Sequence, residues 1–321
     1  MLILSHADVR AALSPEACER AMREVLAARA RGATHQPLRS VMAPPSAGGL
    51  MGLMPAWGHA GDGAAAEFAL KVVCVMRGNP ARGLDAHQGV VALFDGETGV
   101  PEAIVDASAV TEIRTAAVTA VATDLLARPG ARVLAILGAG VQARAHVHAL
   151  RATREYTEAR AYAPTAAHVG ALDGVTPCAT AEEAVRGADV VVTATNSRTP
   201  VLRHEWLSPG AHVNAIGASM PSAHEIEPET FAEAAVFADS RESVRTEAGE
   251  YRLAVERGLI EGEGHIRAEL GEVLTGLRGG RAAEDELTLF RSLGIAVEDL
   301  AAARSAVDAA RELGIGVEVT L

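Results

Sequence analysis

The stretch that decides the fold is VLAILGAGVQARAH, residues 133–146. An apolar run leads into Gly138, Gly140 and Ala143, which fit the pattern G-x-G-x-x-A, and a helix-forming segment follows. Small residues there permit a tight turn, let a pyrophosphate approach the backbone and let the helix pack closely on the strand. The helix N-terminus adds amide donors and a partial positive charge. In this context the stretch predicts dinucleotide binding; the alternative is a tight turn without a ligand.

Further short apolar runs follow this loop, and helix-forming segments separate them. They are EARAYAP (158–164), ADVVVTAT (188–195), HVNAIGA (212–218) and AAVFADS (234–240). Alternating strands and helices imply crossover connections and a parallel sheet that is covered on both faces. We therefore predict the fold class α/β, with a doubly wound Rossmann domain over residues 120–300.

The first third of the chain has another texture. A helix is marked over residues 14–32 by Ser14 as N-cap, Pro15 in the first turn and Gly32 past its end. Strands are predicted in FALKVVCVM (68–76) and GVVALFDGETG (89–99), and a long Ala-rich helix in residues 110–130. The tail reads as a helix and a last strand that return to this part. We predict an α+β domain of residues 1–119 joined by 301–321.

Composition narrows the class of protein. The 321 residues are 49% hydrophobic, and 29 basic against 41 acidic residues give a net charge of −12. This balance argues against nucleic acid or an anionic membrane as the main partner. The opening MLILSHADVR does not read as a signal peptide, and no apolar run is long enough to span a bilayer. Three scattered cysteines suit a reducing compartment, so we expect a cytoplasmic protein.

The adenosine end of the cofactor is not specified by the sequence. An acidic residue about 20 positions after the glycine loop would bind the ribose of NAD. The second strand instead ends in Ala163 and Pro164, with no Asp, Glu or Arg; Thr165 and His168 are the polar residues nearby. The choice between NAD and NADP is therefore open.

Three cations stand in apolar or small-residue contexts: Arg39, Lys71 and Arg114. Burying a cation is costly unless it meets an anion or lines a cleft. Each one alone reads equally well as a residue of a functional site or as a structural cation, either in a salt bridge or on the surface with its charged end in water. Three together are typical of a carboxylate-binding site, in which the arginines bind a carboxylate and the lysine polarises an imine or moves a proton.

Other polar residues carry weaker signals. His87 could face the same cleft, but a hydrogen-bonded turn residue is the preferred interpretation. His224 and Glu225 are expected on the surface, and no metal-binding motif, P-loop or nucleophile elbow is found.

Over nearly its whole length the chain resembles the ornithine cyclodeaminase/μ-crystallin family. The most specific segments are ALFDGETGVPEAIVDASAVTEIRTAAVTAVATDLLAR (92–128), the glycine loop and TLFRSLG (288–294). The resemblance implies a homodimer with a Rossmann domain for NAD or NADP and a domain for substrate binding and dimerisation.

The resemblance also implies roles for individual residues. Arg39 and Arg114 would bind the carboxylate of a small imino or amino acid, and Lys71 would act near its nitrogen. The cofactor would contact two groups of residues: in the first part of the chain His87 and Thr115, and in the Rossmann domain Gly138, Gly140, Val141, Gln142, Ala143, Thr195, Ile216, Gly217, Ala218 and Ser292. From the residues alone, Ala163 and Thr165 at the end of the second strand are further candidates for contact with the cofactor. Gly294 belongs to the same late segment as Ser292.

Two positions depart from the cyclodeaminase pattern. Ornithine cyclodeaminases have Asp where this chain has Ser219 and Glu where it has Gly52; the ketimine reductase branch is neutral at both. A serine cannot serve as a carboxylate base near neutral pH, so a catalytic role of Ser219 is doubtful.

We therefore expect an NAD(P)H-dependent reductase, or reversible dehydrogenase, acting at the C=N or C–N carbon of a small imino or amino acid. The alternative is an ornithine cyclodeaminase, which converts L-ornithine to L-proline and ammonia. Further alternatives are an alanine dehydrogenase-like enzyme and a protein that binds a dinucleotide and a carboxylate ligand without turnover.

Overall fold

The computed structural model describes residues 1–59, 65–76 and 78–320. The chain divides into two compact units: Met1–Ala117 together with Gly294–Leu321 (unit 1), and Val118–Leu293 (unit 2). The sequence analysis placed these divisions at 119/120 and 300/301. Unit 1 takes up the chain again at Gly294 because the C-terminal helix begins at Ala296 and packs on the sheet of that unit.

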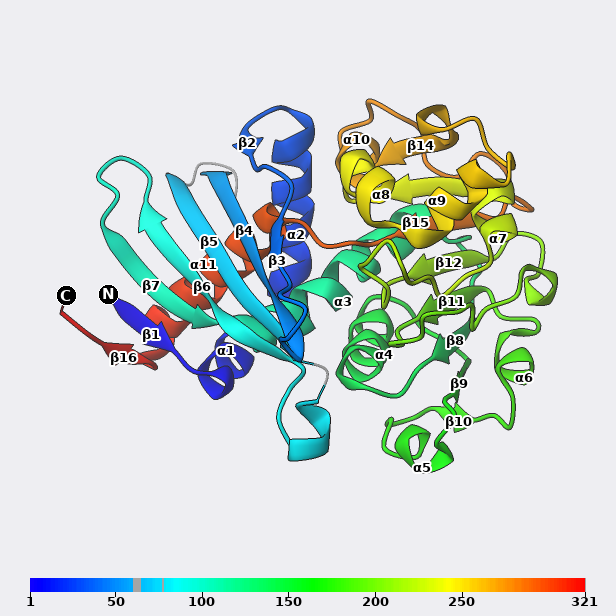
Figure 1. Ribbon diagram of the computed structural model, residues 1–321, viewed down its shortest axis with the longest axis horizontal. Coiled ribbons are helices and arrows are strands. Elements are labelled where there is room, and N and C mark those ends of the chain that lie inside the picture. The colour runs from blue at the N-terminus through cyan, green and yellow to red at the C-terminus, as the bar shows by residue number, and fades with distance from the viewer. Residues whose placement is uncertain (60–64, 77, 321) are drawn as a thin grey trace. The chain divides into compact units, whose positions relative to one another are not determined.

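Unit 1 is built on a mostly antiparallel sheet (Figure 1) with the strand order β16-β1-β7-β6-β5-β4-β2, and β3 also pairs with β4. Its strands are β1 (Leu2–Leu4), β2 (Thr34–His35), β3 (Ser40–Met42), β4 (Gly49–His59), β5 (Ala66–Met76), β6 (His87–Asp95), β7 (Pro101–Asp106) and β16 (Val317–Glu318). The predicted last strand does return to unit 1, since β16 pairs antiparallel with β1.

The helices of unit 1 are α1 (His6–Ala12), α2 (Pro15–Ala30), the first part of α3 (Ala107–Leu126) and α11 (Ala296–Leu313). The predicted start of α2 is confirmed: the Ser14 hydroxyl accepts a hydrogen bond from the Ala17 amide at 3.2 Å. Past the end of α2, Gly32 adopts a φ of 74°, which favours glycine. Helix α11 contacts strands β4, β5 and β6, so it covers one face of the sheet.

Alternation along β5 decides which side chains meet this helix. Glu67, Ala69, Lys71 and Val73 are buried, whereas Phe68 between them is exposed. Successive side chains of a strand point to opposite faces, so Lys71 lies on the face that α11 covers. In the sheet it stands between Met54 of β4 and Val91 of β6, both of which are buried.

Unit 2 is the predicted doubly wound domain, and the α/β fold class is confirmed. Every pairing of its sheet is parallel, in the order β10-β9-β8-β11-β12-β15-β13-β14. The strands are β8 (Val133–Leu137), β9 (Glu158–Tyr162), β10 (Thr176–Pro177), β11 (Val190–Thr193), β12 (His212–Ala215), β13 (Ala235–Ala238), β14 (Ile266–Glu269) and β15 (Thr288–Arg291). Strands β10, β14 and β15 were not predicted.

The helices of unit 2, besides the rest of α3, are α4 (Val141–Thr153), α5 (Ala166–Val169), α6 (Ala181–Val185), α7 (Pro228–Glu233), α8 (Arg241–Glu247), α9 (Gly249–Glu256) and α10 (Leu270–Leu274). The central strands β8, β11 and β12 are almost completely buried, as strands covered on both faces must be. Within the described residues, no helix has the length and hydropathy needed to cross a membrane.

Candidate functional site

The glycine loop lies where the sequence predicts it, directly between β8 and α4. Gly138 has a φ of 126°, and a Cβ at this residue would stand 2.4 Å from the carbonyl oxygen of Ala194. Only glycine therefore fits this turn. Gly140 is the N-cap residue of α4, and a Cβ there would meet no atom within 4 Å. The loop is thus tight on the side of the sheet and open at the start of the helix, which is the shape that a pyrophosphate needs.

The other predicted cofactor segments of unit 2 follow neighbouring strands. Thr195 comes after β11, Ile216–Ala218 after β12 and Ser292 after β15. In the sheet these strands follow β8 in the order β8-β11-β12-β15. Backbone hydrogen bonds join the segments: Ile216 donates to Thr193 at 3.0 Å, and Ser292 donates to Ala215 at 3.2 Å. The predicted cofactor segments thus lie together at the carboxyl ends of neighbouring strands, where open α/β sheets bind ligands.

Glu225 holds two of these loops together, and the prediction that it lies on the surface is wrong. Only 2% of it is exposed. Its Oε1 accepts from the amide and hydroxyl of Thr195, at 2.6 and 2.7 Å. Its Oε2 accepts from the Thr193 hydroxyl and from the amides of Gly217 and Ala218. Burial raises the pKa of this carboxyl, although the hydrogen bonds oppose that shift.

A buried arginine supports the same segment through its carbonyl groups. The guanidinium of Arg291, on β15, forms an ion pair with Glu250, and both side chains are 1% exposed. It also donates to the carbonyl oxygens of Ala215 and Ala218. The turn Ile216–Ala218 is therefore fixed from two sides. The Glu225 carboxylate accepts hydrogen bonds from its amide groups, and the Arg291 guanidinium donates to the carbonyl oxygen of Ala218 and to that of Ala215 just before the turn. The hydroxyl-bearing Ser219 that follows is exposed.

The segment predicted to meet the adenosine end follows β9. Thr165 is the N-cap residue of the short helix α5, and its side chain makes no capping hydrogen bond. Ala163 is half-buried and Thr165 is exposed. Nothing in this segment adds the acidic residue that NAD binding usually requires.

In unit 1 the three predicted cations come together. Lys71 Nζ lies 2.9 Å from Asp299 Oδ1, and Arg114 Nε lies 3.1 Å from the same oxygen. Arg114 Nη1 also lies 2.8 Å from Glu298 Oε2. Arg39 Nη2 donates to the carbonyl oxygen of Gly294 at 2.6 Å. A Cβ on Gly294 would stand 2.5 Å from Arg114 Nη2, so the backbone there lies against the guanidinium.

Burial governs the electrostatics of this cluster. The pKa of Lys71 falls to about 8 because burial disfavours its charge and because Arg114 and Arg39 repel it, while Asp299 raises it. For Asp299, burial would raise the pKa, but Lys71, Arg114 and Arg39 outweigh burial and lower it. Lys71 can therefore exchange a proton near neutral pH, which an arginine cannot do.

Two carboxylates, Glu298 and Asp299, were missed as members of the cluster because they read as ordinary charges at the start of a helix. A signal for Lys71 itself also went unused: it is the only lysine in the chain, beside 28 arginines. Because every other lysine or arginine position holds arginine, the one lysine at a buried position indicates a role that arginine cannot fill.

The remaining predicted residues of unit 1 are Thr115 and His87. The Thr115 hydroxyl donates to the Thr111 carbonyl at 2.6 Å, and the residue is 6% exposed. His87 begins β6 and is exposed. Partial desolvation, followed by the charges of Lys71 and Arg114, lowers its pKa, and Asp85 opposes that shift. His87 therefore stands close enough to the cluster to feel its charge.

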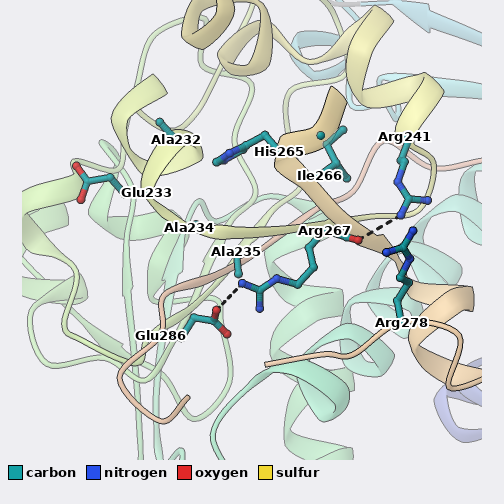
Figure 2. A pocket seen from close by; sticks show the side chains of 11 residues that line it. Ala232, Glu233, Ala234, Ala235, Arg241, His265, Ile266, Arg267, Arg278 and Glu286 are labelled. Carbon is teal, nitrogen blue, oxygen red and sulfur yellow. Dashed lines mark hydrogen bonds and ion pairs between the residues drawn. The ribbon is translucent and has the colours of Figure 1, made fainter. Parts of the chain in front are cut away.

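A cavity of about 590 Å³ lies elsewhere in unit 2, along the edge strand β14 (Figure 2). Arg267 there pairs with Glu286 at 2.6 Å, and its carbonyl accepts from Arg241. Arg241 pairs with Glu272 at 2.6 Å. Four strands separate β14 from β8. We assign no cofactor to this cavity, because the glycine loop is remote from it.

Known proteins resemble the chain along most of its length. Ketimine reductase mu-crystallin of Mus musculus is 38% identical over 86% of this chain and 86% of its own. The structure of Thermococcus litoralis Delta(1)-pyrroline-2-carboxylate reductase in complex with NADH and L-proline is 31% identical, with a TM-score of 0.94, and covers 99% of this chain and 100% of its own. An archaeal alanine dehydrogenase dimer with bound NAD is 33% identical, with a TM-score of 0.92 and a coverage of 100% and 99%.

The family model for ornithine cyclodeaminase and mu-crystallin matches residues 1–313. This match covers both units, and so includes the glycine loop of unit 2 and the cation cluster of unit 1. The chain belongs to the ornithine cyclodeaminase/mu-crystallin family.

Proposed function

We propose that this protein is an NAD(P)H-dependent reductase of small imino acids. The observation that carries the proposal is the lone lysine, Lys71, which is buried against Asp299 beside Arg114 and has a pKa of about 8. An amine of this kind suits proton transfer to a substrate nitrogen, because its two protonation states are close in free energy at neutral pH.

Unit 2 supplies the binding site for the dinucleotide in this proposal. Gly138, Gly140 and the N-terminus of α4 would hold the pyrophosphate, and the turn Ile216–Ala218 would lie along the nicotinamide half. When bound, the reduced nicotinamide supplies a hydride to the carbon of a C=N bond. The nicotinamide class of cofactor is supported by relatives that bind NADH or NAD; the choice between NAD and NADP needs a binding measurement.

Unit 1 supplies the groups for the substrate. Arg39 and Arg114 would bind its carboxylate, because a guanidinium matches a carboxylate in geometry and charge. Lys71 would donate one proton to the imine nitrogen as the C=N electron pair moves onto that nitrogen. The substrate would thus gain one hydride at its carbon and one proton at its nitrogen and become an amine. The lysine then regains its proton from solvent.

The test is direct. Purified protein is mixed with NADH or NADPH and with pyrroline-2-carboxylate or piperideine-2-carboxylate, and the loss of reduced cofactor is followed by absorbance. We expect turnover with at least one cyclic imine. Ammonia release from L-ornithine with NAD would instead favour a cyclodeaminase. Saturable cofactor binding without turnover on a broad panel of imines and amino acids would favour a binding protein.

Amino acid dehydrogenation is the second candidate, because the archaeal alanine dehydrogenase matches the chain over its full length. The same groups would serve it, since pyruvate and ammonia form an acyclic imine with a carboxylate. Comparing kcat/KM for pyruvate with ammonia against kcat/KM for the cyclic imines separates the two functions.

We also propose a homodimer in the cytoplasm. The sheet face of unit 1 opposite α11 carries exposed apolar side chains on adjacent strands: Leu53 on β4 at 39%, Phe68 on β5 at 48% and Val90 on β6 at 39%. Leu53 and Val90 flank Val72 in the sheet, and Phe68 lies on the same face four residues from Val72 along β5. Exposed apolar side chains gathered on one face are typical of an interface. Light scattering on the native protein should give twice the chain mass, and Phe68→Glu should shift it toward the monomer; a native monomer would refute the proposal.

A further inference from the structure

One carboxylate oxygen of Asp299 accepts hydrogen bonds from two of the three cations of the cluster, and the other oxygen accepts none within the described part of the chain. Oδ1 accepts from Lys71 at 2.9 Å and from Arg114 at 3.1 Å. Oδ2 is buried without a hydrogen-bond partner among the described residues. Asp299 is 1% exposed and stands in the first turn of α11, so the helix fixes its position on the sheet.

The charges around Lys71 would favour a neutral amine if Asp299 were absent. Arg114 on α3 and Arg39 are positive, and burial also disfavours the ammonium. Glu298 pairs with Arg114 instead of Lys71. His87 on β6 responds to the same cations, and Cys18 on α2 lies near Arg114 and Glu298 with its pKa raised by burial. Among these groups Asp299 is the anion in direct contact with the lysine.

We propose that Asp299 is a positioning residue that keeps Lys71 protonated and fixes the place of its Nζ. The ammonium, not the amine, would then meet the substrate nitrogen, and Asp299 would not touch the substrate itself. The catalytic consequence rests on the proposed reductase function; the protonation of Lys71 does not, and it can be measured without substrate or cofactor.

Asp299→Asn is a sharp variant for this purpose. The asparagine oxygen can still accept from Lys71 and Arg114, and its amide nitrogen would take the place of Oδ2, which has no partner to lose. The substitution thus removes the charge and retains the observed hydrogen bonds. Asp308→Asn is the matched control, because Asp308 lies on the same helix, exposed, and pairs with Arg304 at 3.4 Å.

The sole lysine makes the measurement clean. Protein grown on isotope-labelled lysine has one labelled side chain, so an NMR titration follows Lys71 alone. We expect a midpoint near pH 8 in the native protein and in Asp308→Asn. In Asp299→Asn it should fall by at least about one pH unit, a tenfold change in the protonation equilibrium. An unchanged midpoint in a folded Asp299→Asn protein would overturn the proposal.

The pH profile of imine reduction gives the second readout. The alkaline limb of kcat/KM should move to lower pH in Asp299→Asn, and lowering the pH should restore much of the lost rate, which a merely structural defect would not allow. If the NMR midpoint moves and the kinetic limb does not, the effect of Asp299 stands and the proton-donor role of Lys71 fails. Should Asp299→Asn not fold, Asp299→Ser removes the same charge with a smaller side chain and is judged by the same midpoint.

Discussion

Glu225 and Thr195 are joined twice: the carboxylate oxygen Oε1 accepts the amide of Thr195 at 2.6 Å and its hydroxyl at 2.7 Å. The second oxygen accepts the amides of Gly217 and Ala218. One buried carboxylate thereby fixes the loops that follow β11 and β12. A buried acceptor with this many donors is expensive to replace, because each donor left unpaired costs about 1–3 kcal/mol.

Glu225→Gln should therefore weaken dinucleotide binding. The amide nitrogen of glutamine would face the N–H groups of Gly217 and Ala218, or that of Thr195, and a donor cannot accept from them. We expect at least a tenfold rise in the Kd for NADH or NADPH, measured by fluorescence titration, and a loss of about 2–4 kcal/mol in the free energy of unfolding. Glu229→Gln, at an exposed pair with Arg257, is the control. Native affinity in Glu225→Gln would contradict this role.

The two glycines of the loop predict opposite behaviour. Gly138→Ala places a Cβ 2.4 Å from the Ala194 carbonyl at a φ of 126°, so it should destabilise the fold by more than about 1 kcal/mol even without cofactor. Gly140→Ala meets no atom within 4 Å and should leave the melting temperature of the apoprotein unchanged while weakening dinucleotide affinity tenfold or more. Equal affinity for cofactor in Gly140→Ala and native protein would argue against pyrophosphate binding at this loop.

The glycine loop and the apolar runs predict unit 2 well because each has a local cause. A tight turn needs glycine at Gly138, and a central strand needs residues that tolerate burial on both faces. Strand β15 was missed because its cause is not local. Its run TLFR ends in Arg291, a residue that looks solvent-exposed until Glu250, 41 positions earlier in the chain, is known to neutralise it.

The cation cluster shows the same limit at the candidate site. Lys71 was identified because its neighbours along β5 are apolar. Glu298 and Asp299 were not, because two acids in the first turn of a helix usually serve the helix dipole. Only the long-range packing of α11 on β5 reveals that Asp299 meets a lysine 228 residues away in the chain.

His146 predicts how the protein responds to acid. Its Nδ1 lies 2.7 Å from the Gln142 carbonyl, so that nitrogen donates, and Nε2 at 3.0 Å accepts from the Thr119 hydroxyl. Burial lowers its pKa from 6.5 to about 4. The unfolded chain therefore binds more protons than the folded one between these values, and stability falls as the pH falls through this window. His146→Asn keeps a donor toward Gln142 and should lose on the order of 3 kcal/mol less stability between pH 6.5 and 4 than native protein. The measurement is the free energy of unfolding at a series of pH values; the same dependence on pH in the two proteins would refute this prediction.

Lys71 should be needed for turnover but not for cofactor binding. Lys71→Ala is expected to lower kcat/KM for imine reduction by a factor of about 100 or more, the scale of general acid catalysis. The Kd for reduced cofactor should stay within about twofold of native. Lys71→Arg separates charge from proton transfer: it keeps the charge but cannot release a proton. Full rescue by arginine would show that Lys71 acts only through its charge, and native rates in Lys71→Ala would remove it from the chemistry.

Ser219 offers a test of what decides the reaction. It is exposed beyond a turn that Glu225 and Arg291 hold firmly, so a change of its side chain should leave the loop in place. Ser219→Asp introduces a carboxylate that ionises near its ordinary pKa at an exposed position, and it can then accept a proton at neutral pH. We expect a rise of about tenfold or more in the release of ammonia and proline from L-ornithine with NAD. Ser222→Asp, which adds the same charge at an exposed residue three positions further on, should produce no such rise. If Ser219→Asp matches native protein on every substrate, this loop does not select between reduction and cyclodeamination.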